Sequence, residues 1–383
     1  MSVTKKDLKF QSIEENPSLL GFGLMRLPRL SETEIDFELG FKMIDYAYNH
    51  GVNYFDTAYP YHLGKSEVFA YEALKKYPRE SYFLADKMPI WECKTLDDVK
   101  RIFNEQLKKC GVEYFDYYLC HAMSGERFKI YKRFKAIEFL QEMKKEGKIR
   151  HLGFSFHGTA DDLLEMVIHE HWDFVQIQFN YFDYDFIEAR KLYEILEKHN
   201  LPVIVMEPVR GGMLASLSEK ANAILKEASP NSSIASWALR FVGSFKNVIC
   251  VLSGMSDFSQ VEDNIKTMTD FKPLSKKESE VLDNALNAFL EEKTILCTKC
   301  EYCLPCSKGV KIPKVFHIYN NYKLFHNAEF FVKSIDGLEE SEKPANCIKC
   351  GKCMKACPQS LTIFQNLEMI NEEYEKLKTE LKL

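Results

Sequence analysis

The chain carries VNYFDTA at residues 52–58, YFLADKM at 82–88 and FDYYLCH at 115–121, and these three runs decide the fold. Each run is short and rich in aromatic and aliphatic residues, which favours a buried strand. The amphipathic stretch 96–110 separates the second run from the third and is long enough for a helix. The sequence therefore predicts that strands and helices alternate here.

The same alternation continues on both sides of these runs. Further strands are predicted at residues 19–25, 150–156, 174–180, 202–208 and 248–255. Further helices are predicted at residues 33–49, 127–145, 161–170, 186–199, 232–242 and 258–268. Eight strands with helical crossovers in about 250 residues predict an α/β fold, the (β/α)8 TIM barrel. An open doubly wound sheet is the alternative, but Gly21-Phe22-Gly23 lies inside the first strand and no Gly-x-Gly-x-x-Gly follows it.

Cysteines are concentrated in the last quarter of the chain. Eight of the 12 lie there in two runs with two-residue spacers, and the second run ends in Cys-Pro. A [4Fe-4S] cubane needs four thiolates, and the remote cysteine before proline ligates the other cluster of such a pair. The spacing therefore predicts two [4Fe-4S] clusters. The first set is Cys297, Cys300, Cys303 and Cys357, and the second set is Cys306, Cys347, Cys350 and Cys353.

Zinc and disulfides are the competing interpretations of these cysteines. Four-thiolate zinc sites also use two-residue spacers, but zinc ribbons usually take their cysteines in separated pairs. The other four cysteines, Cys93, Cys110, Cys120 and Cys250, are scattered through segments predicted to be core or helix, and we interpret them as buried free thiols.

The composition changes after Pro273, where the chain becomes richer in Lys, Glu and Cys. We predict a barrel domain at residues 1–273 and a mostly helical, ferredoxin-type iron-sulfur domain at 274–383. Helices are expected in the second domain at residues 276–292, 315–331 and 366–383. The aromatic segment 315–331 is expected to pack the cluster domain onto the barrel.

Charge and hydropathy restrict the partners. A formal net charge of −5 over 383 residues leaves no basic stripe for nucleic acid. The first thirty residues contain Lys5, Lys6, Glu14 and Glu15 without the apolar core of a signal peptide, and no run has the length of a membrane span. We therefore expect a cytoplasmic protein, in the reducing compartment that thiolate-bound iron indicates, with no nucleic-acid or membrane partner.

Four polar residues fall at or just beyond the ends of neighbouring strands: Asp56, Tyr61, Lys87 and His121. The carboxyl ends of barrel strands form one face, so these side chains should converge. Reduction of a carbonyl needs a proton donor for the oxygen. Tyr61 can supply that proton, Lys87 is expected to lower the pKa of the phenol, Asp56 to hold Lys87, and His121 to orient the substrate oxygen. Singly, each also has an ordinary interpretation, as helix cap, packing aromatic, surface charge or core histidine.

Longer motifs surround this set of residues. They are Phe55–Tyr61, Lys65–Glu67, Asp86–Met88, Tyr117–His121, Ile149–Ser155, Val175–Asn180, Met206–Leu214 and Leu252–Ser256. From about residue 20 to residue 264 the chain resembles the aldo-keto reductase family. Its cysteine-rich tail resembles that of the branch of this family fused to a ferredoxin-type domain with two [4Fe-4S] clusters.

The resemblance implies a role for particular residues. Tyr61 would be the general acid, with Asp56, Lys87 and His121 as its partners. For the nucleotide, the resemblance implies Ser155 and Gln176 at the nicotinamide amide, Arg210, Gly211 and Gly212 beside the pyrophosphate, and Gly254, Met255, Ser256 and Asn264 around the adenosine phosphate end.

Two positions depart from the family pattern. Many members have Asn after the serine of the fifth strand, where this chain has Phe156. Members that use NADPH often carry Lys or Arg near the 2′-phosphate, where Gly254 and Gln260 stand. The choice among NADPH, NADH and FMN is therefore left open.

Three functions agree with these features. In the first, the barrel reduces a carbonyl or oxidises an alcohol with a nicotinamide or flavin nucleotide, and the clusters pass single electrons to or from an external carrier such as ferredoxin or flavodoxin. The second is a conventional NAD(P)H carbonyl reductase with structural or redox-sensing clusters. The third is a non-enzymatic electron-carrier or interaction module on a barrel that has no catalytic activity. An aromatic mouth with Arg26 available to an acidic substrate is expected from Met25, Arg26, Tyr59, Trp91, Phe156, Tyr181 and Phe182.

Overall fold

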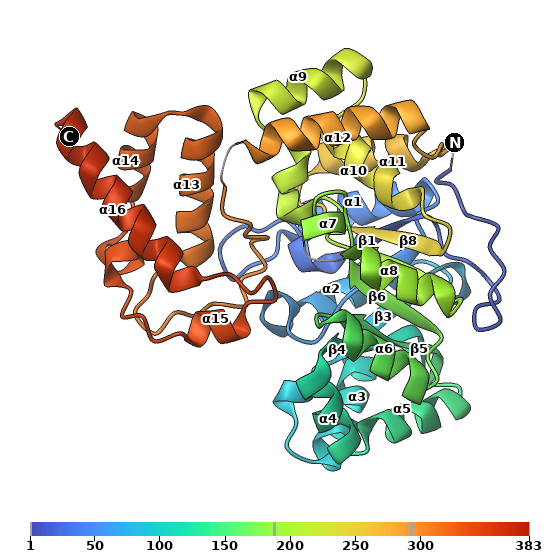
Figure 1. The fold of residues 1–383 in the computed structure, drawn as a ribbon. Helices are drawn as coiled ribbons and strands as arrows, with labels where there is room; N and C mark the ends of the chain where they lie inside the picture. The colour runs from blue at the N-terminus through green and yellow to red at the C-terminus, as the bar shows by residue number, and fades with distance from the viewer. Residues whose placement is uncertain (1, 187–188, 292–293, 383) are drawn as a thin grey trace. The chain divides into compact units, whose positions relative to one another are not determined.

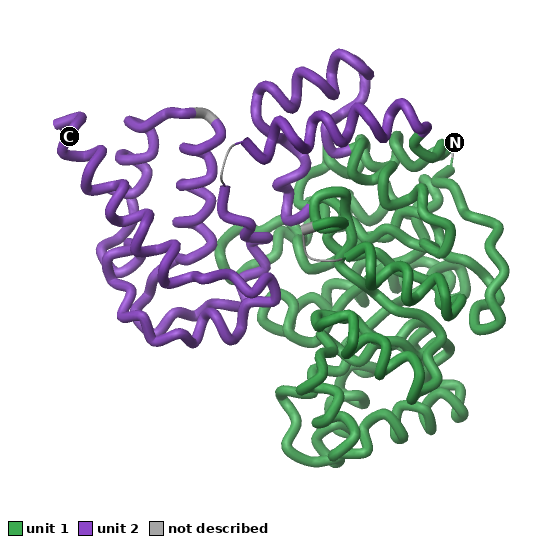
Figure 2. The backbone as a smooth tube through the Cα atoms, in the orientation of Figure 1, with its two compact units in different colours: residues 1–209, 236–274 green, residues 210–235, 275–383 purple. Residues whose placement is uncertain are grey.

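The computed structural model describes residues 2–186, 189–291 and 294–382. The chain divides into two compact units, coloured separately in Figure 2. The first contains residues 1–209 and 236–274, and the second contains residues 210–235 and 275–383. The change of unit after Leu274 lies beside the predicted division at residues 273/274. The second unit, however, also takes residues 210–235, which the sequence-based division assigned to the barrel.

The first unit is built on a closed barrel of eight parallel strands in which each strand pairs with the next and the last with the first (Figure 1). This confirms the predicted (β/α)8 barrel and all eight predicted strands. The strands are β1 (Leu20–Gly23), β2 (Tyr54–Asp56), β3 (Phe83–Met88), β4 (Phe115–Met123), β5 (Ile149–Phe156), β6 (Phe174–Gln178), β7 (Val203–Met206) and β8 (Val248–Ser253).

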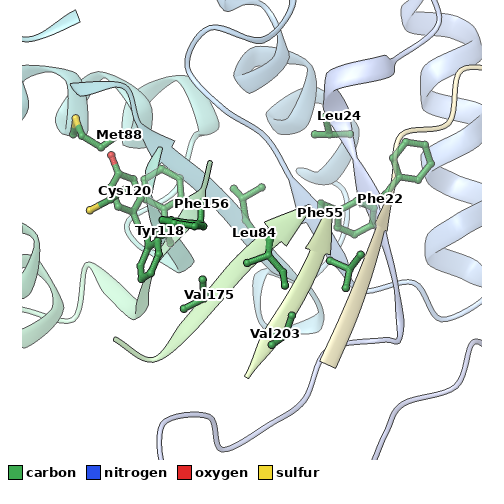
Figure 3. Close-up of a cluster of buried hydrophobic side chains, with 14 of the residues drawn as sticks. Phe22, Leu24, Phe55, Leu84, Met88, Tyr118, Cys120, Phe156, Val175 and Val203 are labelled. Atoms are coloured by element: carbon green, nitrogen blue, oxygen red, sulfur yellow. The ribbon is translucent and has the colours of Figure 1, made fainter. Parts of the chain in front are cut away.

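Neighbouring residues of the strands pack on opposite sides of the sheet. Phe55 and Leu84 belong to the large core cluster between strands and helices, and Figure 3 shows them there. Their neighbours Tyr54 and Ala85 belong to a separate cluster that includes Tyr117. Strands have a side-chain period of two, so the second cluster fills the barrel interior. Both faces of the strands are buried, as a parallel sheet requires.

Helices of the first unit follow the strands along the chain. They are α1 (Phe37–Asn49), α2 (Ser66–Leu74), α3 (Leu96–Cys110), α4 (Gly125–Arg133), α5 (Ala136–Lys145), α6 (Ala160–His169), α7 (Asp183–Phe186), α8 (Ala189–Lys198), α10 (Ile234–Gly243) and α11 (Phe258–Met268). Helix α3 begins at a capping box formed by Thr95 and Asp98 and ends at Gly111, whose φ is 60°. The predicted helix 127–145 is instead two helices, since Lys135 adopts a left-handed conformation between them.

The second unit is helical, with α9 (Glu219–Ala228), α12 (Lys276–Leu290), α13 (Ile312–Phe325), α14 (Ala328–Asp336), α15 (Lys352–Ala356) and α16 (Ile363–Leu381). The predicted helix 315–331 is two helices, because His326 takes a positive φ and Asn327 caps α14. Helices α13, α14 and α16 pack on one another around buried Phe316, Phe331 and Ile370. Aromatic residues of segment 315–331 thus pack inside the second unit, and packing of this segment onto the barrel stays a prediction. In the described part of the chain, no helix combines the length and hydropathy that crossing a membrane requires.

Candidate active site and cysteine sites

The alternation of the strands directs four polar side chains into one end of the barrel. Each of them stands two residues after a member of the cluster that fills the barrel interior. The four side chains are Asp56, Lys87, His121 and Gln176, and the cluster members that precede them are Tyr54, Ala85, Leu119 and Phe174. Side chains two apart on a strand share a face. Asp56, Lys87, His121 and Gln176 are buried, with exposed fractions of 4%, 1%, 3% and 2%. The structure thus brings together the residues that the sequence placed at the strand ends.

Lys87 is the centre of this set. Its Nζ donates to Asp56 Oδ1 at 2.5 Å, to the Thr57 carbonyl at 2.7 Å and to Tyr61 Oη at 3.3 Å. An ammonium has three protons and no acceptor, so these three contacts use all of its donors. The phenol oxygen accepts from Lys87, and its own proton is therefore left for another acceptor.

Tyr61 follows β2 in a tight turn in which His62 and Leu63 have positive φ values of 50° and 56°. Burial raises the pKa of the Tyr61 phenol well above its usual value, and the negative charge of Asp56 raises it further. The phenol pKa is thus raised overall, and the expected lowering effect of the neighbouring Lys87 ammonium stays a prediction. The phenol stays protonated at neutral pH, which is the form that a proton donor needs.

His121 lies across from the phenol, with ring centroids 6.0 Å apart and the rings nearly perpendicular. Burial lowers the pKa of His121 well below its usual value, and the positive charge of Lys87 lowers it further. Its Nδ1 is buried and has no hydrogen-bond partner in the described residues. An irregularity in the pairing of β4 with β5 begins beside His121, where Ala122 has a φ of 50°. Such irregularities in a strand change the direction of side chains next to active sites.

Ser155 and Gln176 were predicted at the nicotinamide amide. Gln176 Nε2 donates to Asp56 Oδ2 at 3.2 Å, so its amide is fixed within the acid–base set. Ser155 Oγ accepts the backbone N–H of Ala122 at 2.7 Å and is buried beside β4. Both side chains belong to the inner face of the barrel end, and contact with a nicotinamide stays a prediction.

The predicted contacts at the adenosine phosphate end lie after β8. Met255 is fully buried, and Asn264 Nδ2 donates to Ser253 Oγ at 2.9 Å. The backbone N–H of Ser256 donates to Gln260 Oε1 at 3.0 Å. Asn264 and Ser256 therefore organise the turn between β8 and α11, and a nucleotide contact of these residues stays a prediction.

Gly254 lies under the side chain of Arg26. A Cβ at Gly254 would meet Arg26 Cδ at 2.9 Å, which leaves no room for a larger residue while Arg26 keeps its position. Arg26 Nη2 pairs with Glu207 Oε1 at 2.8 Å. Arg26 was expected to be available to an acidic substrate, but in this structure Glu207 already neutralises it.

Glu207 and Arg127 also lie at this site and were not predicted from the sequence. Glu207 directly follows β7 and faces Arg26. It raises the pKa of Tyr61, so it acts on the same site. The rule that flagged Asp56, a polar residue at a strand's carboxyl end, would have found it. Arg127 lies over the Trp91 ring at 4.8 Å, and Trp91 lies 4.9 Å from the His121 ring. No local pattern signals that stack.

Arg210 and Gly211 were predicted beside the pyrophosphate, yet they belong to the second unit. Arg210 is 1% exposed and donates to the Leu296 carbonyl at 2.7 Å and to Gln359 Oε1 at 3.2 Å. A Cβ at Gly211 would lie 2.1 Å from the Thr298 carbonyl. Both residues are therefore committed to the segments that carry the first cysteine set, whereas Gly212 has open space at its Cα.

The cysteines gather in two cavities of the second unit. Cys297, Cys300, Cys303 and Cys357 line the first, whose walls include buried Ile312, Phe316 and Ile363. The second cavity is lined by Cys306, Cys347, Cys350 and Cys353, and Cys303 borders it as well.

These two groups are the sets that the spacing assigned to separate clusters, and thiol-lined cavities suit iron cubanes. In the described residues, no group of three or more His, Cys, Asp or Glu side chains is arranged to hold a single metal ion. Iron ligation by these eight residues stays a prediction.

The remaining cysteines agree with their interpretation as core residues. Cys93, Cys110, Cys120 and Cys250 are buried free thiols in the structure.

Comparison with known proteins gives two family matches. Residues 19–287 match the model described as aldo/keto reductase family, and residues 296–362 match that of a 4Fe-4S dicluster domain.

Similar proteins include two enzymes and one solved structure. The chain is 24% identical over 278 residues to the NADH-specific methylglyoxal reductase of Escherichia coli, covering 61% of this chain and 84% of that protein. It is 27% identical over 268 residues to L-galactose dehydrogenase of Arabidopsis thaliana, covering 64% and 82%. An aldo-keto reductase from Bacillus halodurans in its holo form has a similar fold, with a TM-score of 0.62 at 23% identity over 74% of this chain and 96% of that one.

Proposed function

The chain belongs to the aldo/keto reductase family and carries a 4Fe-4S dicluster domain, and on this premise we propose that it couples carbonyl–alcohol chemistry in the barrel to single-electron exchange through two [4Fe-4S] clusters. The substrate would be a small carbonyl compound or the corresponding alcohol. An external one-electron carrier, ferredoxin or flavodoxin, would be the partner.

The arrangement around Lys87 carries the proposal for the barrel. Asp56 and the Thr57 carbonyl hold the ammonium, and the ammonium in turn holds the phenol oxygen of Tyr61. The Tyr61 proton is thereby directed away from Lys87, towards a substrate oxygen. The raised pKa of Tyr61 keeps that proton in place until negative charge develops on the oxygen.

Each residue then has one task. A nicotinamide nucleotide supplies hydride to the carbonyl carbon when bound. Tyr61 gives its proton to the carbonyl oxygen, and Lys87 stabilises the phenolate that remains until solvent returns a proton. His121, neutral because burial lowers its pKa, offers a ring N–H to the same oxygen and so orients the carbonyl. Hydride and proton together convert the carbonyl to an alcohol.

NADH is the nucleotide that we favour. The Escherichia coli relative is named as NADH-specific, and the position near the 2′-phosphate carries Gly254 and Gln260 rather than Lys or Arg. NADH would then be the hydride donor for the carbonyl, and exchange with the clusters would need a flavin such as FMN in addition, because a flavin takes up or gives electrons both in pairs and singly. The proposed division into a barrel at residues 1–273 and an iron-sulfur domain at 274–383 separates the two chemistries.

The proton-donor role is tested with Tyr61→Phe in the anaerobically reconstituted full chain. We expect NADH-dependent reduction of methylglyoxal to fall by about 100-fold or more, because the transferred proton is lost. Tyr77→Phe is the control, since Tyr77 bonds Asp45 outside the barrel end. Equal rates for Tyr61→Phe and the wild type would rule out this assignment.

The coupling is tested with a variant lacking Cys347 and Cys350, with Cys93→Ala as the control. With FMN present to collect single electrons into a pair, we expect dithionite-reduced ferredoxin to drive carbonyl reduction in the wild type and the control but not in the double variant. If the double variant keeps full NADH-dependent activity and the wild-type clusters never change oxidation state, the protein is a conventional reductase with structural or redox-sensing clusters.

A further inference from the structure

The two cysteine cavities differ in how far they open to solvent. Each cysteine of the first set is at least partly buried, and its cavity is walled by Ile312, Phe316 and Ile363. Cys350 of the second set is exposed. Ile348, which lines the same cavity, is 58% exposed, a large fraction for an isoleucine beside a cofactor site.

Positive charge surrounds this opening. Residues 343–360 contain four lysines and no Asp or Glu, although the whole chain has a net charge of −5. Lys343 and Lys349 pair with Glu340 and Glu368. Lys308, Lys352 and Lys355 are exposed and form no ion pair within the described residues, and Lys352 also lines the cavity. The local charge is therefore opposite in sign to that of the molecule.

We propose that Lys308, Ile348, Cys350, Lys352 and Lys355, here called the lysine face, form the docking surface for a small acidic one-electron carrier protein. The proposal rests on the proposed electron-transfer function and names the chemistry of its partner. An apolar residue at the centre with charges around it is the usual composition of such a contact. The positive charge beside the second cavity is complementary to an acidic carrier and would steer it towards the cluster whose cysteine is exposed.

The redox step at this face is a single outer-sphere transfer. One electron leaves the reduced carrier and enters the oxidised cluster of the second set, so the carrier is oxidised by one electron and the cluster is reduced by one. No bond forms or breaks and no proton moves. The exposed Cys350 sulfur is the part of that cluster that the carrier approaches.

The test reverses charge at the lysine face without touching a cysteine. K352E/K355E is compared with K100E/K108E, which makes the same charge change on exposed lysines of α3 in the first unit. Binding of a small acidic ferredoxin to the reconstituted full chain is measured by anaerobic calorimetry at low salt. Cluster bleaching after mixing with the reduced ferredoxin is followed by stopped flow.

We expect K352E/K355E to weaken binding and slow bleaching by about tenfold, and K100E/K108E to change neither by more than about twofold. The wild-type rate should fall with salt, and that dependence should be smaller in K352E/K355E. Reduction by reduced methyl viologen, a small cation, should be at least as fast in K352E/K355E as in the wild type, which shows that its clusters are intact. Unchanged ferredoxin binding in K352E/K355E, or equal loss in both variants, would overturn the docking surface.

Two further outcomes are distinct. Binding of the wild type to phosphatidylserine vesicles, lost in K352E/K355E and unaccompanied by ferredoxin binding, would assign the face to a membrane and overturn the carrier. If ferredoxin binds and bleaches the clusters as expected but no carbonyl is reduced, the docking surface stands and the proposed coupling fails.

Discussion

At the scale of single residues, the site is organised by a buried charge pair. Lys87 and Asp56 have side chains that are 1% and 5% exposed, and the ammonium also holds Tyr61. A buried pair of this kind is weak evidence for stability, because desolvation offsets the attraction between the charges. Its use here is geometric, since it fixes the direction of the phenol proton.

The pKa values of the site lead to an expected pH profile. The pKa of Tyr61 is raised, so its donor form persists at every pH below about 10, and the pKa of His121 is lowered, so its neutral form persists above about 6.5. We therefore expect kcat/KM for carbonyl reduction to be constant between about pH 6.5 and about pH 10, and to fall on the alkaline side only above about pH 10. Steady-state rates across this range provide the measurement. A fall between pH 7 and about 9 would show that the pKa of the Tyr61 phenol is lowered overall and not raised.

Arg210 is the residue whose predicted and observed surroundings differ most. It donates to Leu296, which precedes Cys297, and to Gln359, which lines the first cavity. A buried cation there stabilises the reduced, more negative cluster. We expect Arg210→Gln to lower the reduction potential of the first cluster by about 60 mV, equivalent to about 1.4 kcal/mol for one electron.

Potentiometric titration followed by electron paramagnetic resonance separates the two clusters in this experiment. Arg240→Gln is the matched control, because Arg240 bonds the Lys272 carbonyl in the first unit. In Arg210→Lys the reduction potential of the first cluster should stay close to the wild-type value, since the substitution keeps the positive charge. A shift of the second cluster in place of the first would contradict the assignment.

At the scale of elements, sequence patterns located strands better than helix breaks. All eight strands were predicted, because buried parallel strands are apolar runs of distinctive length. The breaks at Lys135 and His326 were not, because nothing in a periodic pattern marks a residue other than glycine that takes a left-handed conformation. Helices α2 and α9 were also missed.

Gly211 and Gly212, which follow β7, allow a matched test of whether the contact with Thr298 positions the first cysteine run. Gly211 and Gly212 both have positive φ, of 64° and 90°, but only Gly211 is pressed against Thr298. We expect Gly211→Ala to displace residues 296–298 and to lower the iron and sulfide bound after anaerobic reconstitution by about one cluster. Gly212→Ala should lower the free energy of unfolding by the same amount as Gly211→Ala for the strained positive φ, about 1 kcal/mol, and should keep both clusters. Equal iron in the two variants would show that the contact does not position the cysteines.

At the scale of the whole molecule, the sequence identified the components but not all of their connections. The acid–base set was predictable, because each member stands at or just after the end of its own strand. The contact of Arg210 with Leu296 joins residues 86 positions apart, and no local pattern encodes it. For the same reason, the assignment of residues 210–235 to the second unit was not foreseen.

The two units should respond differently to loss of iron. Residues 294–311 form no helix or strand, so the cysteines there depend on their ligands for order, whereas the barrel has its own large core. We expect chelation to increase hydrogen exchange in residues 294–311 and 343–360 and to leave the eight strands unchanged. Mass spectrometry of peptides from the native and the chelated chain checks this. Faster exchange in β4 or β5 after chelation would show that the barrel depends on the clusters.

The exposure of Cys350 also sets the order in which the protein should fail in air. Dioxygen reaches a surface thiolate and its iron before it reaches the cavity walled by Phe316. Damage would therefore begin where the carrier binds, cutting the molecule off from its electron supply while the barrel remains folded. The working lifetime of such an enzyme in aerated cells would then depend on how quickly this outer cluster is repaired.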